Sequence, residues 1–222
     1  MRRYLSIAAA FTLAFGVSAS AQQPPPAPTP LRGYLVAGGG SSIGLPQTAV
    51  TLSGEVAESI PLNLQVYLNA SFYDDVMSDS ARNTLAASAQ VLSVVTGTQW
   101  ELSGRDKARS FTLGVKYLVS TASSIHPYIG GGFGGINIRR VINDTRRGDI
   151  TQAYLGEFGA PDSIVDPSQS NTNHPLGELS GGVGISIKKA YVDLGYRYRK
   201  AFHTGADSLT LSQVGISAGL RF

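Results

Sequence analysis

The chain has 222 residues, of which 42% are hydrophobic and 15% are charged, and it contains no cysteine. That length fits one domain, and the lack of cysteine excludes a disulfide scaffold, a thiol nucleophile and Cys-ligated metal sites. Its three histidines are scattered singly, so a transition-metal site is not expected. The formal charge of +3 falls to +1 without Arg2 and Arg3, so charge gives no indication of nucleic-acid binding.

The first 30 residues have the composition of an export signal followed by a spacer. A positively charged start precedes an apolar stretch over 5–17, and Ala19 and Ala21 are the small residues of a cleavage site. The apolar stretch falls short of the ~20 residues that a membrane-spanning helix needs, so we expect cleavage after Ala21. Residues 22–30 contain five prolines and are expected to form an extended periplasmic lead-in to a domain over 31–222.

From residue 31 onward the dominant pattern is alternation of apolar and polar residues, which is typical of strands with two different faces. The last segment is the clearest: Val214, Ile216 and Leu220 share one face, while Gln213, Ser217 and Arg221 share the other. The same period predicts strands over 50–56, 62–72, 111–117, 178–187, 192–199 and 213–222, and two glycine-rich strands near 31–39 and 127–138. The total is eight strands, most of about ten residues, the length of a tilted transmembrane strand.

Three features decide which face is buried. Aromatic residues lie near strand ends on the apolar face, as at membrane–water interfaces: Phe72, Phe111, Tyr117, Tyr196, Tyr198 and Phe222. The polar faces combine glycine and serine with opposed charges, which suits a narrow lumen. Connections alternate between short links near 57–61, 119–126 and 188–189 and long ones over 73–107 and 139–175. A secreted, ligand-holding barrel would need more large apolar residues at the polar positions.

These patterns resemble the OmpA-type family of small outer-membrane β-barrels. The resemblance rests on the terminal Gly219-Leu220-Arg221-Phe222 and on Pro127-Tyr128 followed by spaced glycines over 130–134. It implies an all-β, eight-stranded antiparallel up-and-down transmembrane barrel in the outer membrane of a Gram-negative bacterium. It also implies that Phe222 is the signal read by the barrel-assembly machinery. The resemblance covers the barrel alone and implies no peptidoglycan-binding domain.

An eight-stranded barrel is filled by its own side chains, and buried charges need partners. The lumen-facing charged residues expected from the alternation are Glu55, Lys116, Glu178, Asp193, Arg197, Arg199 and Arg221. A two-residue turn at Lys188-Lys189 places Glu178 opposite Arg199, which predicts an ion pair. Such a filled lumen favours a structural or surface-recognition role over transport. A narrow channel, gated by exchange of ion-pair partners, is the alternative.

Two further motifs suggest chemistry that we do not expect here. Gly130, Gly132 and Gly135 match the spacing of a dinucleotide fingerprint, but the chain continues as a strand and not as the helix that the motif requires. We therefore predict no cofactor, and we expect these glycines either to let bulky neighbours pack across the lumen or to lie in a close-packed wall. A lipid-modifying enzyme at the rim, the second alternative, would use histidine, serine and a carboxylate. The residues available are His174, His203, Asp162, Asp166, Asp207, Ser170 and Ser208, with His126 in a periplasmic turn. No spacing connects them, and we predict no enzyme.

The long connections are the expected contact surface. Segment 78–96 has a capping pattern and helical apolar spacing, which predicts either a helix over the barrel mouth or an extension of the strands. Asp74, Asp75 and Asp79 lack the spacing of a calcium loop, so we predict no metal. The expected partners are outer-membrane lipid and lipopolysaccharide, whose phosphates would meet Arg139, Arg140, Arg146 and Arg147. The extracellular ligand cannot be named from the sequence.

Overall fold

The computed structural model describes residues 31–43, 49–119, 123–158, 171–202 and 209–222. The predicted signal (1–21) and lead-in (22–30) lie outside the described residues. The elements are β1 Gly33–Ile43, β2 Val50–Ile60, β3 Leu64–Tyr73, α1 Asp79–Thr96, β4 Leu102–Leu118, β5 Ile125–Asp144, β6 Gly148–Asp149, α2 Thr151–Phe158, β7 Asn171–Ile187, β8 Ala190–Ala201 and β9 Leu209–Arg221.

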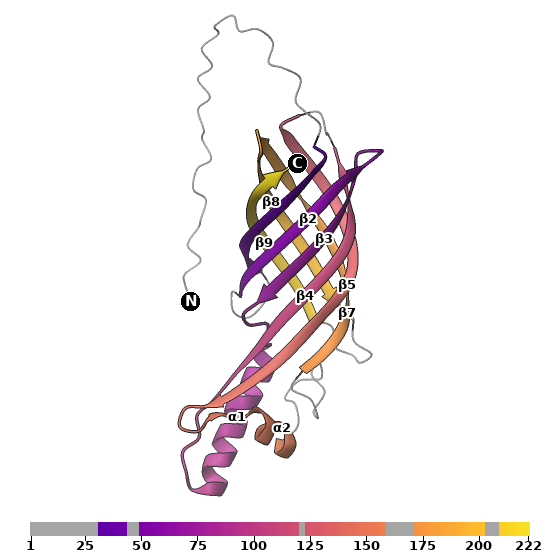
Figure 1. The fold of residues 1–222 in the computed structure, drawn as a ribbon. Coiled ribbons are helices and arrows are strands. Elements are labelled where there is room, and N and C mark those ends of the chain that lie inside the picture. Colours follow the sequence, from indigo (N-terminus) through magenta and orange to yellow (C-terminus); the bar gives the residue numbers. More distant parts are fainter. Residues whose placement is uncertain (1–30, 44–48, 120–122, 159–170, 203–208) are drawn as a thin grey trace, which may run out of the picture.

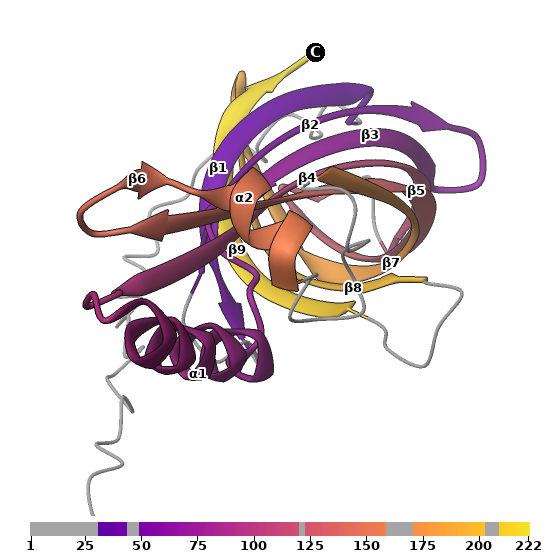
Figure 2. The ribbon, with the colours of Figure 1, turned by 90° about the horizontal axis from the view of Figure 1, so that it is seen from below.

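Eight of these strands form a closed antiparallel barrel, which confirms the predicted fold class (Figure 1, Figure 2). Each strand pairs with the next in the order β4-β3-β2-β1-β9-β8-β7-β5, and pairing of β4 with β5 closes the ring. β6 is only a two-residue addition to β5. Closure removes sheet edges, so every strand of the wall has a neighbour on both sides.

The apolar face of the barrel points outward and is exposed. Side chains such as Leu220, Phe133 and Leu113 are more than half exposed along the wall, whereas their neighbours in sequence face inward. This orientation suits a barrel surrounded by lipid and would be unfavourable for one in water. No helix among the described residues has the length and apolarity to cross a membrane.

Several predicted boundaries were wrong. Leu62 belongs to the β2–β3 turn, where Leu62 and Asn63 have φ of 70° and 59°, as a type I′ turn requires. β4 begins at Leu102 and β5 extends to Asp144, so 102–107 and 139–144, which were expected to lie in the long connections, form an extended β4–β5 hairpin. The sequence did not predict this extension, because the outward-facing residues of β4 and β5 are mostly polar beyond the apolar wall and resemble those of a loop.

A cap, defined as β6, α1, α2 and the β4–β5 hairpin beyond the wall, lies at the end opposite the C-terminus (Figure 1). Segment 78–96 is helical: Ser78 accepts a hydrogen bond from the backbone N–H of Ala81, and Gly97 ends α1 in the left-handed conformation. Seen along the barrel, α1 lies beside the ring of strands and not across its mouth, as Figure 2 shows. Met77, Leu85, Ile142, Tyr154 and Leu155 contribute to the cap's apolar core.

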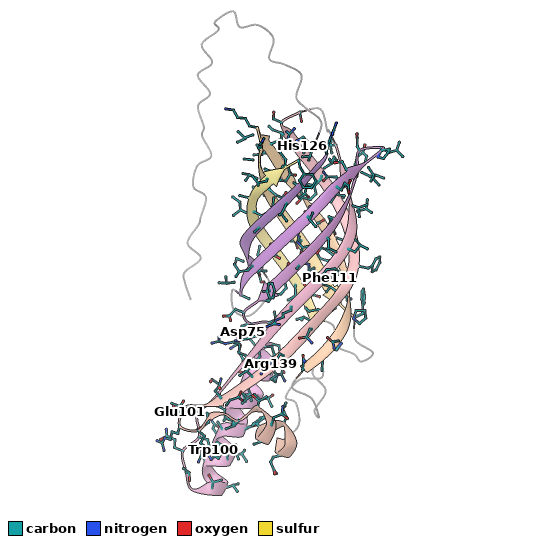
Figure 3. The ribbon with its side chains drawn as sticks, viewed as in Figure 1. Asp75, Trp100, Glu101, Phe111, His126 and Arg139 are labelled. Atoms are coloured by element: carbon teal, nitrogen blue, oxygen red, sulfur yellow. The ribbon has the colours of Figure 1, made fainter. Side chains whose placement is uncertain are left out.

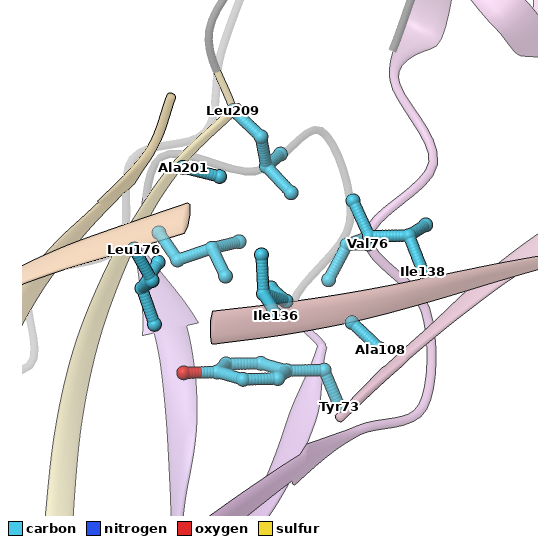
Figure 4. Packing of buried hydrophobic residues seen from close by; sticks show 9 residues of the cluster. Tyr73, Val76, Ala108, Ile136, Ile138, Leu176, Ala201 and Leu209 are labelled. Atoms are coloured by element: carbon cyan, nitrogen blue, oxygen red, sulfur yellow. The ribbon is translucent and has the colours of Figure 1, made fainter. Parts of the chain in front are cut away.

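A second apolar cluster closes the barrel at the end nearer the cap (Figure 4). Its members come from six strands and from the segment that follows β3: Tyr73, Val76, Ala108, Ile136, Ile138, Leu176, Ala201, Leu209 and Leu211. Aromatic and aliphatic side chains around Tyr34, Tyr128 and Tyr191 fill the opposite end of the barrel. The polar part of the lumen therefore lies between two apolar layers.

Candidate functional site: the charged lumen and the cap

Six of the seven charged residues expected in the lumen are buried there. Glu55, Lys116, Glu178, Asp193, Arg197 and Arg199 are each no more than 7% exposed. Each follows from the alternation of its strand, which turns every second side chain inward. The seventh, Arg221, is half-exposed at the last position of β9, because the wall ends there.

Glu55 on β2 is the centre of the first cluster. Its Oε1 accepts hydrogen bonds from Lys116 Nζ and from the Tyr34 hydroxyl, the latter at 2.6 Å, while its Oε2 lies 2.8 Å from Arg197 Nη2. Lys116 comes from β4 and Arg197 from β8, so these bonds connect different sides of the wall. The Glu55 carboxylate thus pairs with two buried cations. Removing its charge would leave Lys116 and Arg197 without an ion-pair partner at this position.

Glu178 and Arg199 form the second cluster. The two-residue turn at 188–189 gives the predicted register, with Glu178 opposite Arg199, and Arg199 Nε lies 2.5 Å from Glu178 Oε2. Tyr67 donates to the other carboxylate oxygen at 2.7 Å. The rest of the Arg199 guanidinium donates to Ser71, Tyr73 and Asn69 on β3, so this arginine also spans the lumen.

Asp193 is less fully satisfied than the other two acids. Its Oδ2 accepts from the Tyr128 hydroxyl at 3.1 Å, while its Oδ1 is buried and has no hydrogen-bond partner among the described residues. Lys116 Nζ lies 4.4 Å from the centre of the Tyr128 ring, and so contributes a cation–π contact nearby. With three acids and three bases buried together, the lumen is charge-balanced.

Lumen tyrosines are the residues that the sequence reasoning missed. Tyr67 crosses the lumen where Gly114 and Gly132 stand opposite each other in β4 and β5. A Cβ on Gly114 would lie 2.5 Å from the Tyr67 ring, and one on Gly132 would lie 2.8 Å from its hydroxyl. Gly132, one of the three glycines for which this role was predicted, therefore lets Tyr67 pack across the lumen, and Gly114 does the same. The signal was present, since Tyr67 shares the polar face of its strand with Gln65 and Asn69.

Aromatic residues predicted at the membrane interfaces are placed on the outer wall. Phe72, Phe111, Tyr117 and Tyr196 are between 44% and 53% exposed, while Tyr198 is half-buried. Phe222 follows β9, where its backbone N–H and carbonyl bond to Gly33. Phe133, the most exposed aromatic of β5, was missed because the glycine-rich strand could not be phased from sequence.

In the cap, Arg140 was wrongly expected to be a surface charge. It is buried and forms a two-bond ion pair with Asp106, its cross-strand partner, because the alternation of the lumen continues into the extended hairpin.

Asp75 pairs with Arg82 at 2.5 Å and accepts hydrogen bonds from the backbone N–H groups of Met77 and Asp106. Asp74 instead lies 3.5 Å from Arg105. The three aspartates therefore do not form a shared metal site, and no metal-binding group is found within the described part of the chain.

Asp144 organises the tip of the hairpin, where Figure 3 shows Trp100 and Glu101. Burial acts to raise the pKa of this carboxyl, but hydrogen bonds from the backbone N–H groups of Glu101, Arg146 and Arg147 outweigh it and hold the pKa below its ordinary range. The Arg147 guanidinium lies 3.7 Å from the centre of the Trp100 ring. This end of the extended hairpin is therefore organised around Asp144, while residues 145–149 are exposed to solvent.

Of the residues considered for an enzyme, only His126 and His174 lie in the described part of the chain. His174 Nε2 lies 3.2 Å from the Thr172 hydroxyl. His126 was expected in a turn, but it is buried on β5 and its Nε2 lies 2.9 Å from the Ser186 hydroxyl, at the end of the barrel opposite the cap. The remaining candidates, which are His203, Asp162, Asp166, Asp207, Ser170 and Ser208, lie outside the described residues.

No protein-family model matches the chain, and no curated protein matches it in sequence. Solved structures do share its fold. Neisserial surface protein A is 12% identical with a TM-score of 0.52, over 86% of this chain and 97% of its own. The N-terminal β-barrel domain of Pseudomonas aeruginosa OprF is 11% identical with a TM-score of 0.51, over 87% of this chain and all of its own. The fold is thus that of small outer-membrane barrels, as the sequence resemblance implied.

Proposed function

We propose that this chain is an integral outer-membrane protein that presents a folded extracellular cap as a recognition surface. The observation that carries the proposal is the hairpin of β4 and β5, which extends beyond the wall and carries α1 on its inward face. A barrel serving only to span the membrane would not need an additional apolar core outside it. The lipid-facing wall supports the location, and Phe222 at the end of β9 is positioned for the assembly signal proposed for it.

A structural role, and not conduction, is favoured for the lumen. Ion pairs connect β2 with β4 and β8, and β7 with β8, and an apolar cluster closes the extracellular mouth. We expect single barrels in planar bilayers to show no steady conductance. Steady single-channel steps would favour the alternative, a narrow channel.

The cap's location can be tested by labelling, because the chain has no cysteine. Val94 on α1 is 84% exposed, while Lys189 is exposed in the turn at the opposite end of the barrel. With V94C and K189C variants on intact cells, a membrane-impermeant maleimide is expected to label V94C and spare K189C until the outer membrane is permeabilised. Labelling of K189C alone on intact cells would mean that the orientation is reversed, and equal protection of both would contradict surface presentation.

A further inference from the structure

The outer wall carries a groove of about 800 Å³ beside the base of the extended hairpin. It forms where β3 ends at Tyr73, opposite Ala108, while β4 and β5 continue without it. Its lining has two chemical parts. Val50, Leu52 and Phe72 provide an apolar side continuous with the lipid-facing wall, and Lys107, Arg109 and Arg139 provide a basic side.

The basic side breaks a local rule of sheet stability. Lys107 and Arg139 are direct cross-strand partners on the outward face of β4 and β5, and like charges in that position destabilise a sheet. Arg109 follows two residues later on the same face. Within the described residues, neither Lys107 nor Arg109 pairs with a carboxylate. Adjacent like charges without a nearby stabilising partner are expected mainly at functional sites, where binding compensates for the loss of stability.

Two carboxylates at the groove are largely committed elsewhere. Asp74 lies 3.5 Å from Arg105 at the outer edge. Asp149 accepts the backbone N–H of Thr151 at 2.9 Å and its hydroxyl at 2.6 Å, and it faces Arg139. The lining thus holds three bases and two acids, one of which is paired with Arg105 outside the lining, and the groove keeps an excess of positive charge.

The two parts meet at Phe72, whose ring centre lies 5.8 Å from the Arg109 guanidinium carbon. This contact marks the level at which the wall changes from lipid-facing apolar residues to charged ones. Figure 3 shows Phe111 on the wall and Arg139 farther toward the cap. A ligand seated here would meet hydrocarbon-like surface at one end and cations at the other.

We propose that this groove binds a phosphorylated lipid of the outer leaflet, with its phosphate at Lys107, Arg109 and Arg139 and an acyl chain along Val50, Leu52 and Phe72. The inference rests on the proposed membrane location, and it adds a specific lipid class as the ligand of this groove. Arginine matches phosphate in bidentate geometry, and lysine supplies a point charge. Of the four arginines that the sequence suggested for lipopolysaccharide phosphates, only Arg139 lines this groove.

Binding can be measured with the full chain folded in detergent, using lipid A that carries two phosphates and the same lipid with both removed. The wild-type protein is expected to bind the phosphorylated form at least tenfold more tightly. The double variant Lys107→Gln and Arg139→Gln should weaken that binding roughly thirtyfold. The matched control, Arg146→Gln with Arg147→Gln, removes the same charge at the hairpin tip and should change it less than threefold. Lys107→Arg should retain binding.

Three results would contradict the proposed lipid-binding site. They are equal binding of the two lipids, equal loss in the test and control variants, and full competition by millimolar inorganic phosphate, which would show that the lipid part contributes nothing. In each case a boiling-dependent mobility shift verifies that the barrel is folded, so the proposed function would stand. A chain without that shift would contradict the proposed membrane location itself.

Discussion

The lumen and the cap each have a buried interior, but the two interiors are held together by opposite means. In the lumen, Glu55 and Glu178 join strands through ion pairs, because the large apolar residues of those strands face outward. In the cap, lipid is absent, and Leu85 and Ile142 pack inward around a core that includes a single side-chain ion pair between β4 and β5. One alternating hairpin runs through both regions, so the surroundings decide which residues its inward face carries.

The largest expected effect is in the lumen. Glu55→Gln removes the carboxylate shared by Lys116 and Arg197 and leaves both cations buried without it. Breaking a buried pair costs about 3–5 kcal/mol, measurable as the free energy of unfolding in detergent by urea titration. Asp74→Asn is the control, since the exposed pair with Arg105 contributes less than about 1 kcal/mol. Equal effects of the two variants would contradict the difference in burial on which the network depends.

A core substitution in the cap should be nearly as costly but local. Leu85→Ala empties a fully buried position against Gly104 and Met77, at a cost of about 2–4 kcal/mol. Hydrogen exchange should become faster in α1 and the extended hairpin while the strands of the wall stay protected. Val94→Ala on the exposed side of α1 should change neither region. Faster exchange in the wall would mean that cap and barrel form one cooperative unit.

Loss of the helix cap should have a smaller effect. Ser78→Ala removes the side-chain oxygen that accepts the Ala81 N–H, which costs about 1 kcal/mol. The first turn of α1 should exchange faster than in the wild type, with the last turn unaffected. Ser80→Ala, two positions later and exposed, is the matched control and is expected to leave exchange unchanged.

The smallest effect should appear at low pH. Because the pKa of Asp144 is held below its ordinary value near 4, its contribution is fully present above that value and is lost as pH falls through the lowered pKa. Trp100, the single tryptophan, lies against Arg147 and should report the change in fluorescence below about pH 4. Asp144→Asn should abolish that transition, and a transition of the same size in this variant would assign it to another group.

The wall was predictable from sequence because its period-2 pattern is strong and the pairing of neighbours is local. The turn at Lys188-Lys189 alone determines that Glu178 faces Arg199. The phase of β5 could not be found, because four glycines over 130–134 remove the side chains that carry the pattern. Once the phase is known, Tyr128 and Phe133 fall on opposite faces.

The cap was predictable only in part. Ser78 and the apolar spacing after it indicated α1, but no sequence pattern predicted that the β4–β5 hairpin would continue to Asp144. Arg140 was misassigned for this reason. Because the predicted strand ended near residue 138, Arg140 was expected in a loop, whereas it lies on β5 and faces inward. Long-range contacts such as Glu55 with Arg197 depend on closure of the ring, which the alternation of a single strand does not encode.

The central claim, a closed barrel with its apolar face toward lipid, is tested most directly by fractionating cells and running the mature protein unboiled and boiled on a denaturing gel. The account predicts that the protein appears in the outer-membrane fraction and that boiling changes its mobility. A soluble periplasmic protein with identical mobility before and after boiling would contradict it.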